Sequence, residues 1–436
     1  MVPVARAIVH VQQLCRPQIS LQNGLYAAAS GQLRGLRRQS TTKDIRDRDL
    51  YQGTGPYLET LEPSLLPSSG STVDFATTPE YICSYSVLNN RVFVPGNPAR
   101  YKMPSMPANL ADTELRKGSE KINTSAVRVN CVSLPKINPT FDFSAIDIYC
   151  SANVLRSLLG MCEQGGSKSY RFHAHLIEQT MMLSAVSYNH GQWQADSPGR
   201  RFEAAFTRPF PGIPKGASYV HTVRYSLGHL QCAVWSECDA FASRGLGQQT
   251  NKRSKTLEAD TFRKQNVFLQ DEMVVVHAGK MVQADNVIEL KTVSYGKWTE
   301  KAIWPKMWLT GVQTVHWGYL TDDKRKCVGV KISKPRQISL KRAQRWQDEF
   351  DRLCTLLSRI RTALAVSKHG ICIGTSEACE AKSTGWARLD LWEPEFDGKV
   401  LDRQEVPQRL RVAQRPFPED FVEQFWIKNK GSTGRE

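Results

Sequence analysis

Two short apolar segments that carry charged residues near one end constrain the fold of this chain more than any other feature. They span residues 233–240 and 285–292, and each has the length and composition of a core strand. Alternate side chains of a strand point to the same face. The segments therefore place two pairs of charged side chains on shared faces: Glu237 with Asp239, and Glu289 with Lys291. On neighbouring strands, three carboxylates and one ammonium group would face one point.

Grouped carboxylates of this kind suit a divalent metal that prefers oxygen ligands, such as magnesium or manganese. A bound metal would lower the pKa of a water molecule and neutralise charge on a phosphate group. Lys291 would then orient that water or meet the negative charge that develops on the phosphate. The alternative is structural, since an isolated Glu-x-Lys strand is more commonly a salt-bridged surface pair than a site.

The order of these motifs resembles the catalytic core of the PD-(D/E)xK nuclease superfamily. Within it, the sequence is similar to the decapping nucleases of the DXO type, which are 5'-end RNA pyrophosphohydrolases and exonucleases. Their motifs run Gly-x-x-x-Glu, Glu-x-Asp and Glu-x-Lys, and the first would be residues 199–203 here, ending at Glu203. The resemblance covers residues 197–319. It implies an α/β fold in which helices flank a mixed sheet.

The resemblance also implies roles for the acidic residues. Glu203, Asp239 and Glu289 would hold one or two magnesium or manganese ions. Glu237 would hold the second ion or its water, and Lys291 would align the attacking water.

Three basic residues are expected at the nucleic acid: Arg200, Arg201 and Lys306. Lys306 marks a departure from the family, whose helix offers a glutamine toward the site at this place. An additional cation there can compete with a metal for the carboxylates, so the substitution questions turnover more than fold.

The chain also resembles a group of fungal proteins sometimes labelled geranylgeranyl pyrophosphate synthetases. Prenyl synthases resemble one another in paired Asp-rich helical motifs that hold magnesium diphosphate. The only adjacent aspartates here are Asp322 and Asp323, in a Lys-rich turn. The residues do not support that label.

The composition shows that the protein is basic and predicts a sizeable hydrophobic core. The chain has 436 residues, a formal net charge of +16, and 41% hydrophobic residues. The positive charge favours nucleic acid as partner, RNA in particular on the resemblance, and leaves any protein partner undefined. No run reaches the roughly 18 apolar residues that cross a bilayer. The eleven cysteines include no Cys-x-x-Cys pair, which predicts reduced thiols rather than zinc ribbons or a disulfide framework.

Residues 1–39 differ from the rest of the chain. They contain five arginines and no acidic residue, and they are rich in Ala, Leu, Gln and Ser. This composition is typical of a mitochondrial transit peptide, so we expect a mitochondrial protein. The alternative is a basic tail on a protein located elsewhere in the cell.

Three further regions are expected. Proline, serine and glycine in residues 40–140 predict an irregular arm with a few short strands, such as 80–93. Residues 141–400 should form the nuclease-like core, and 401–436 a peripheral tail. Patterns in the core predict helices at 146–162, 258–266, 295–309 and 339–364, a strand at 170–177, and hairpins around 278–279 and 322–324.

His173 and His175 share one face of the predicted strand 170–177. They could form a metal pair, but with no third histidine nearby a polar strand face explains them better.

Two functions from different classes follow. The first is a metal-dependent nuclease or 5'-end RNA-processing hydrolase. The second is a catalytically inactive protein that keeps the nuclease fold and binds RNA, or assists assembly, in mitochondria. Lys306 is the residue that motivates the second.

Overall fold

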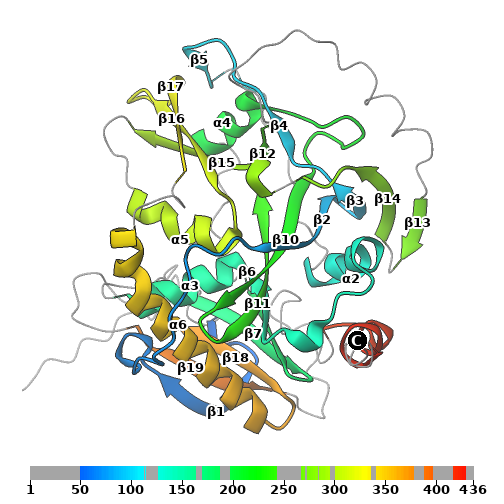
Figure 1. Cartoon of the computed structure of the whole chain (residues 1–436), viewed down its shortest axis with the longest axis vertical. Coiled ribbons are helices and arrows are strands. Elements are labelled where there is room, and N and C mark those ends of the chain that lie inside the picture. The colour runs from blue at the N-terminus through cyan, green and yellow to red at the C-terminus, as the bar shows by residue number, and fades with distance from the viewer. Residues whose placement is uncertain are drawn as a thin grey trace, which may run out of the picture. The chain divides into compact units, whose positions relative to one another are not determined.

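The computed structural model describes residues 50–111, 113, 126–163, 169–186, 197–242, 267–270, 273–282, 284–294, 300–334, 340–377, 387–395 and 416–428. The expected transit peptide (1–39) and the predicted helix 258–266 lie outside these residues. The described part forms two mixed β-sheets with helices packed against them (Figure 1). No helix within it is long and apolar enough to span a membrane.

The larger sheet has twelve strands, and its middle contains parallel pairs. Its order is β1 (Thr54–Leu61), β19 (Leu389–Pro394), β18 (Ile371–Ser376), β7 (Tyr170–Ile177), β8 (Thr180–Ala185), β6 (Ile148–Ser151), β11 (Leu230–Cys238), β10 (Ser218–Leu227), β2 (Glu80–Leu88), β3 (Arg91–Gly96), β14 (Met273–Gly279) and β13 (Val267–Gln270).

The smaller sheet has seven strands. Its order is β5 (Ala108–Asn109), β17 (Lys326–Ser333), β16 (Thr314–Leu320), β15 (Val287–Ser294), β12 (Ala240–Phe241), β4 (Ala99–Tyr101) and β9 (Thr207–Arg208). The central pair β15 and β16 is parallel, whereas β16 and β17 form the hairpin expected around 322–324.

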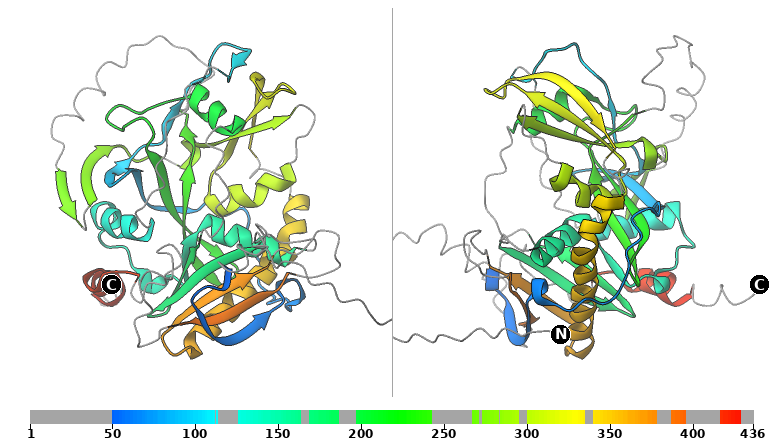
Figure 2. Two further views of the ribbon diagram at one scale, coloured as in Figure 1. Left: turned by 180° about the vertical axis from the view of Figure 1, so that it is seen from behind. Right: turned by 60° about the vertical axis from the view of Figure 1, so that its left-hand side comes forward.

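Helices cover both faces of the larger sheet, as the views in Figure 2 show. One face packs against α3 (Ala152–Cys162), α5 (Glu300–Thr310) and α6 (Leu340–Val366). The other carries α2 (Ala126–Ile137), the 3-10 turn Phe143–Ala145, and a C-terminal segment with α7 (Glu419–Val422) and a π turn at Glu423–Ile427. The remaining helix, α4 (Pro198–Phe206), packs against the smaller sheet, and further 3-10 turns lie at Pro63–Leu65 and Ala284–Asn286.

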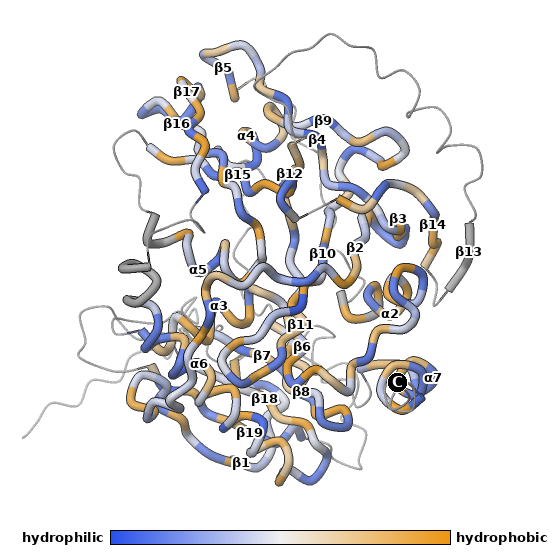
Figure 3. Tube along the Cα trace, viewed as in Figure 1, coloured by the Kyte–Doolittle hydropathy of each residue, from blue (hydrophilic) through white to orange (hydrophobic). Residues whose placement is uncertain are grey.

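The long helix α6 shows why the sequence folds this way. Its apolar residues recur every three or four positions, and from Trp346 to Leu364 that stripe is buried in the main core. The tube of α6 in Figure 3 changes between hydrophilic and hydrophobic colours along its length, as an amphipathic helix should. The helix predicted at 339–364 is therefore confirmed, and so is the strand at 170–177.

Three segments add detail to these expectations. The arm 40–140 contains short strands, as expected, and these strands join both sheets. The tail 401–436 is not wholly peripheral, because Phe417, Phe421, Phe425 and Trp426 are buried against the larger sheet. The helix predicted at 146–162 begins only at Ala152, after β6.

The hairpin predicted around residues 278–279 is wrong. β14 continues to Gly279 as the parallel neighbour of β3. Gly279 has a positive φ of 93°, and a Cβ atom there would overlap the backbone of Gly96. Glycine at this position permits a close approach of two strands rather than a turn.

Candidate active site

The candidate site lies where the chain passes from one sheet to the other. β11 pairs with β10 as far as Cys238, and β12 begins at Ala240 in the smaller sheet. Asp239 is the residue between them. β12 pairs with β15 over only two residues, so the backbone hydrogen bonds between the two strands end at Ala240. Beyond that point the Asp239 side chain supplies the acceptor. Its Oδ2 accepts a hydrogen bond of 2.8 Å from the backbone N–H of Leu290.

β15 has one polar and one apolar face around this point. Ile288 and Leu290 pack against Phe202 and Phe206 of α4. The opposite face of the strand therefore carries Glu289 and Lys291, toward α5.

Glu289 is the most enclosed member of the site, with a side chain only 1% exposed. Its Oε1 accepts from the ammonium groups of both Lys291 and Lys306. The Lys291 Nζ also lies 3.8 Å from Asp239 Oδ2 and donates to the carbonyl of Leu290 at 3.1 Å. Two cations thus converge on one buried carboxylate oxygen.

The two carboxylates respond to this environment in opposite directions. Burial alone would raise the pKa of Glu289, but Lys291 and Lys306 outweigh burial and hold that pKa below its usual value. Burial raises the pKa of Asp239 well above its usual range, and the charges of Glu289 and Glu203 act in the same direction. Lys291 opposes that rise without cancelling it. The protonated form of Asp239 is therefore favoured more than that of an exposed aspartate.

Lys291 is held in its charged form. Burial alone would lower its pKa, but the charges of Glu289 and Asp239 outweigh burial and raise that pKa above its usual value.

Glu203 lies on α4. This helix starts at Pro198, and its N-cap Ser197 accepts from the backbone N–H of Arg200 at 3.3 Å. Glu203 is half-buried, and its charge raises the pKa of both Asp239 and Lys291. Glu203 therefore adds negative charge in the neighbourhood of Asp239 and Lys291.

Glu237 is placed differently from the expectation. It is exposed near the end of β11, opposite Val220 of β10, and its charge acts on the buried Tyr85. Asp239 instead points to β15 in the smaller sheet. The expected pairing on one strand face does not form, because the chain changes sheets between these two residues.

The three basic residues also differ from one another. Lys306 contacts Glu289, and Arg201 uses its Nη1 to donate to the carbonyls of Leu110 and Ala111 at 3.2 and 2.7 Å. Arg201 thus anchors the chain after β5. Arg200 is half-buried in the first turn of α4.

His221 on β10 supports α5, the helix that carries Lys306. The sequence did not indicate this role, because a histidine on an apolar strand resembles any other core residue. Its Nε2 lies 2.9 Å from the carbonyl of Thr310, the last residue of α5. The carbonyl can only accept, so Nε2 carries the proton. Burial lowers the pKa of His221 to about 4 and keeps the imidazole neutral.

The chemistry of the donor set suits a divalent metal, because Glu203, Asp239 and Glu289 supply only oxygen atoms. The arrangement is occupied by ammonium groups, however. Within the described residues no group of three or more His, Cys, Asp or Glu side chains is positioned to hold a metal ion. The ligands are present, but Glu289 is turned toward two lysines.

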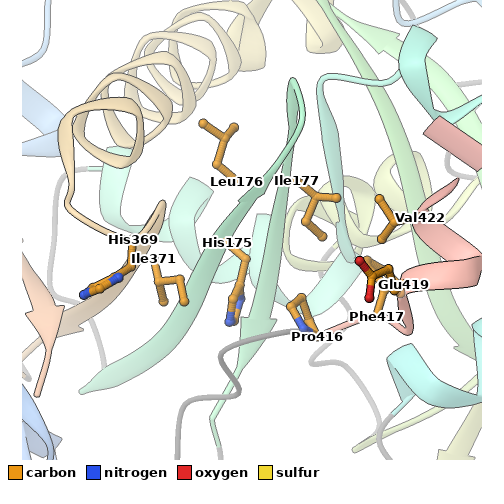
Figure 4. Close-up of a pocket in the computed structure, with 9 residues that line it drawn as sticks. All are labelled: His175, Leu176, Ile177, His369, Ile371, Pro416, Phe417, Glu419 and Val422. Atoms are coloured by element: carbon orange, nitrogen blue, oxygen red, sulfur yellow. The ribbon is translucent and has the colours of Figure 1, made fainter. Parts of the chain in front are cut away.

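Other candidate features lie away from this site. His173 and His175 are buried on β7, and burial followed by the charge of Arg171 lowers the pKa of His173 to about 3. A pocket of about 240 Å³ lies between β7, β18 and the C-terminal segment (Figure 4). His175, His369 and Glu419 are the polar residues among those that line it. The nine cysteines within the described residues are free and buried, as expected.

A family model described as "Domain of unknown function (DUF8563)" matches residues 58–387. None of the curated proteins matches the chain.

Several solved structures share the fold. Rai1 from Candida albicans, crystallised in complex with pU5-Mn2+, is 12% identical over 84% of this chain and 99% of its own, with a TM-score of 0.52. A mutant of S. pombe Rai1 in complex with 3'-FADP is 14% identical over 77% of this chain and 98% of its own, with a TM-score of 0.51. Rai1 from Scheffersomyces stipitis is 12% identical over 82% of this chain and 97% of its own, with a TM-score of 0.51. The expected fold class, a nuclease-like mixed sheet flanked by helices, is confirmed.

Proposed function

Because the chain belongs to the family described as "Domain of unknown function (DUF8563)" and has the fold of Rai1, we propose that it is a 5'-end RNA-processing hydrolase of the decapping type. The observation that carries this proposal is the cluster of Asp239, Glu289 and Lys291 where the chain changes sheets, with the charge of Glu203 acting on Asp239. A C. albicans Rai1 structure that contains pU5 and Mn2+ supports the choice of RNA and of a divalent metal.

Glu203, Asp239 and Glu289 would hold magnesium or manganese, which when bound makes water a stronger nucleophile and neutralises phosphate charge. The protein's own residues set the geometry around that position. The Leu290 N–H fixes one oxygen of Asp239, so its other oxygen keeps a defined direction.

Lys291 is proposed to position the attacking water or to meet charge that develops on the phosphate. It keeps its proton, because the carboxylates raise its pKa, and it therefore acts as a cation rather than a base. Glu237 is exposed near the end of β11, apart from Asp239 and Glu289, so we propose no role for it at this metal position.

The net charge of +16 would attract the RNA backbone. Arg200 in the first turn of α4 is proposed to contact phosphate near the acidic site. Arg201 is proposed to act indirectly, since its guanidinium already binds two backbone carbonyls. We also propose that residues 1–39 direct the protein to mitochondria, which import of a fluorescent fusion to these residues would test.

The test uses the full chain and RNA labelled at a 5' monophosphate, triphosphate or cap, with manganese or with EDTA. We expect metal-dependent products that disappear in Asp239→Asn. Asp322→Asn, at an exposed turn of the β16–β17 hairpin, is the matched control and should keep activity. Full activity in Asp239→Asn would refute the proposal.

A second function is favoured by the Lys306–Glu289 ion pair. In that case the chain binds RNA, or assists assembly, without turnover. The same experiment separates the two: RNA binding that persists in EDTA, with no product on any substrate, would establish the second function.

A further inference from the structure

The Lys306 ammonium group contacts a carboxylate oxygen of Glu289 that could otherwise bind a metal ion. Glu289 is almost fully buried, and Lys306 and Lys291 both donate to its Oε1. A carboxylate oxygen that accepts from two ammonium groups has little remaining capacity for a cation. A metal ion bound through Oε1 would therefore compete with Lys306, and one bound through the other oxygen would lie beside the two ammonium groups.

The charges of the site point the same way. Glu203, Asp239 and Glu289 are the three carboxyl groups of the candidate site, and Lys291 and Lys306 are two ammonium groups that act against their charge. The positive charge of Lys306 therefore weakens the attraction of these carboxyl groups for a metal ion.

Of the two lysines, Lys306 is the one that can leave. Lys291 is on β15 beside its acceptors and contacts Glu289, Asp239 and the carbonyl of Leu290. Lys306 reaches the site from α5, and among the described residues Glu289 is the acceptor recorded for it. Exposure does not distinguish the two lysines, since the Lys306 side chain is 22% exposed and the Lys291 side chain 34%. The difference lies in the acceptors, because Lys306 can turn its ammonium group to solvent or to an anion by giving up Glu289, whereas Lys291 would give up three acceptors.

The helix itself is fixed. Trp304, Met307 and Trp308 surround Lys306 in sequence and are all buried. His221 binds the carbonyl of Thr310 at the end of α5. Displacement is therefore confined to the four-carbon side chain of Lys306.

We infer that Lys306 is an internal competitor of the divalent metal and that a phosphate at the 5' end of RNA draws it away from Glu289. Metal and phosphorylated RNA end then bind cooperatively: the phosphate takes Lys306, and the freed carboxylate takes the metal. This inference rests on the proposed function and adds to it a requirement for RNA before tight metal binding.

The test measures Mn2+ affinity of the full chain by isothermal titration, with and without a short non-hydrolysable RNA that carries a 5' phosphate. We expect the unaltered protein to bind Mn2+ weakly alone and about tenfold or more tightly with the RNA, within the usual range of coupling between two sites. A 5'-hydroxyl RNA of the same sequence should produce little gain.

Lys306→Gln removes the competing charge and keeps a polar side chain of moderate length. It should bind Mn2+ about tenfold or more tightly than the unaltered protein without RNA, and the RNA should add little. Lys306→Arg keeps the cation and should remain weak. Lys324→Gln, at the exposed turn of the β16–β17 hairpin, is the distant control for loss of one positive charge.

The inference is overturned if Lys306→Gln binds Mn2+ no better than the unaltered protein. Lys306→Met, with a thermal melt of each variant, guards against loss of folding as the cause. If the unaltered protein hydrolyses RNA with manganese while Lys306→Gln gains no affinity, the proposed function stands and the competition fails. If the unaltered protein does not hydrolyse RNA but Lys306→Gln binds Mn2+ more tightly, Lys306 does compete with the metal and the proposed hydrolase function is refuted.

Discussion

Two buried carboxylates of this protein accept hydrogen bonds from different kinds of donor. The kind of donor distinguishes a carboxylate that anchors a chain segment from one that belongs to a candidate site. Asp351 on α6 is 5% exposed and accepts from the hydroxyls of Ser68 and Ser69 and from the N–H of Ser71 at 3.0 Å. Glu289 on β15 is similarly buried but accepts from two ammonium groups.

The donors around Asp351 belong to one chain segment, and other contacts of α6 hold the same segment. Thr355 donates to the carbonyl of Pro67 at 3.0 Å, and Gln347 donates to the carbonyl of Ser71 at 3.1 Å. Replacing the donors of Asp351 by a cation would release this segment from α6, whereas the Lys306 ammonium is on a flexible side chain that can move by itself. Buried carboxylates that bind ammonium groups are therefore the better candidates for sites.

Glu289→Gln should have the largest effect, because it removes the buried carboxylate that two ammonium groups share. Loss of one partner from a buried ion pair commonly costs about 3–5 kcal/mol of unfolding free energy. RNA hydrolysis should also fall to background. Urea denaturation at neutral pH and the labelled-RNA assay measure the two effects.

The double variant Glu289→Gln/Lys306→Met is the control for that result. It removes one cation together with the anion, so it should recover much of the stability and none of the hydrolysis. A double variant as unstable as Glu289→Gln would mean that the excess positive charge left by the substitution is not the cause.

Acidification should lower the free energy of unfolding through His221, which binds the end of the helix that carries Lys306. His221 is neutral when folded, with its pKa lowered to about 4, whereas an unfolded histidine takes a proton near pH 6.5. The unfolded state therefore binds more protons between these values, and stability falls as the pH falls from about 6.5 to about 4. At about 1.4 kcal/mol for each pKa unit, His221 accounts for about 3 kcal/mol.

Denaturation midpoints of the unaltered protein and of His221→Gln, measured between pH 7 and pH 4, test this. The variant should be less stable at pH 7 and lose less stability on acidification. Burial also lowers the pKa of His173 to about 3 and of His316 to about 4, so part of the acid sensitivity should persist. Parallel pH curves for the two proteins would contradict the role of His221.

Much of the fold could be predicted from local pattern. The apolar stripe of α6, the alternation of β7 and the acidic ends of β11 and β15 are each visible in consecutive residues. The burial of the C-terminal aromatic residues was not predictable, because Phe417, Phe421 and Trp426 find their partners near Phe143 and Tyr149, more than two hundred positions away in the chain.

The sequence could predict candidates for the site but not their geometry. The ordered motifs predicted Glu203, Glu237, Asp239, Glu289 and Lys291, and of these the structure brings Asp239, Glu289 and Lys291 together. The change of sheet at Asp239, which separates it from Glu237, depends on pairing with Ile288 and its neighbours fifty residues later. Whether the carboxylates converge on metal or on ammonium is likewise decided by tertiary contacts.

Asp351→Ala should destabilise the fold without affecting the site. It leaves two hydroxyls and one backbone N–H without their acceptor, which we expect to cost about 2 kcal/mol of unfolding free energy. Hydrolysis and Mn2+ affinity of the folded fraction should not change. Asp348→Ala, an exposed aspartate on the same helix, is the matched control and should be close to neutral. Loss of metal affinity in Asp351→Ala would break the distinction between anchor and site.

The smallest effect is expected at a third carboxylate, Asp147, whose pairing with a cation is exposed. The Arg361 Nη1 lies 2.7 Å from Asp147 Oδ1, with side chains 30% and 28% exposed. Water and salt screen such a pair, so Arg361→Ala should cost less than about 1 kcal/mol, and 1 M NaCl should remove the difference. The destabilisation of Glu289→Gln should persist in the same salt, because Glu289 is buried. If both effects vanished in salt, burial would not be what distinguishes the Glu289 ion pairs from those of the surface.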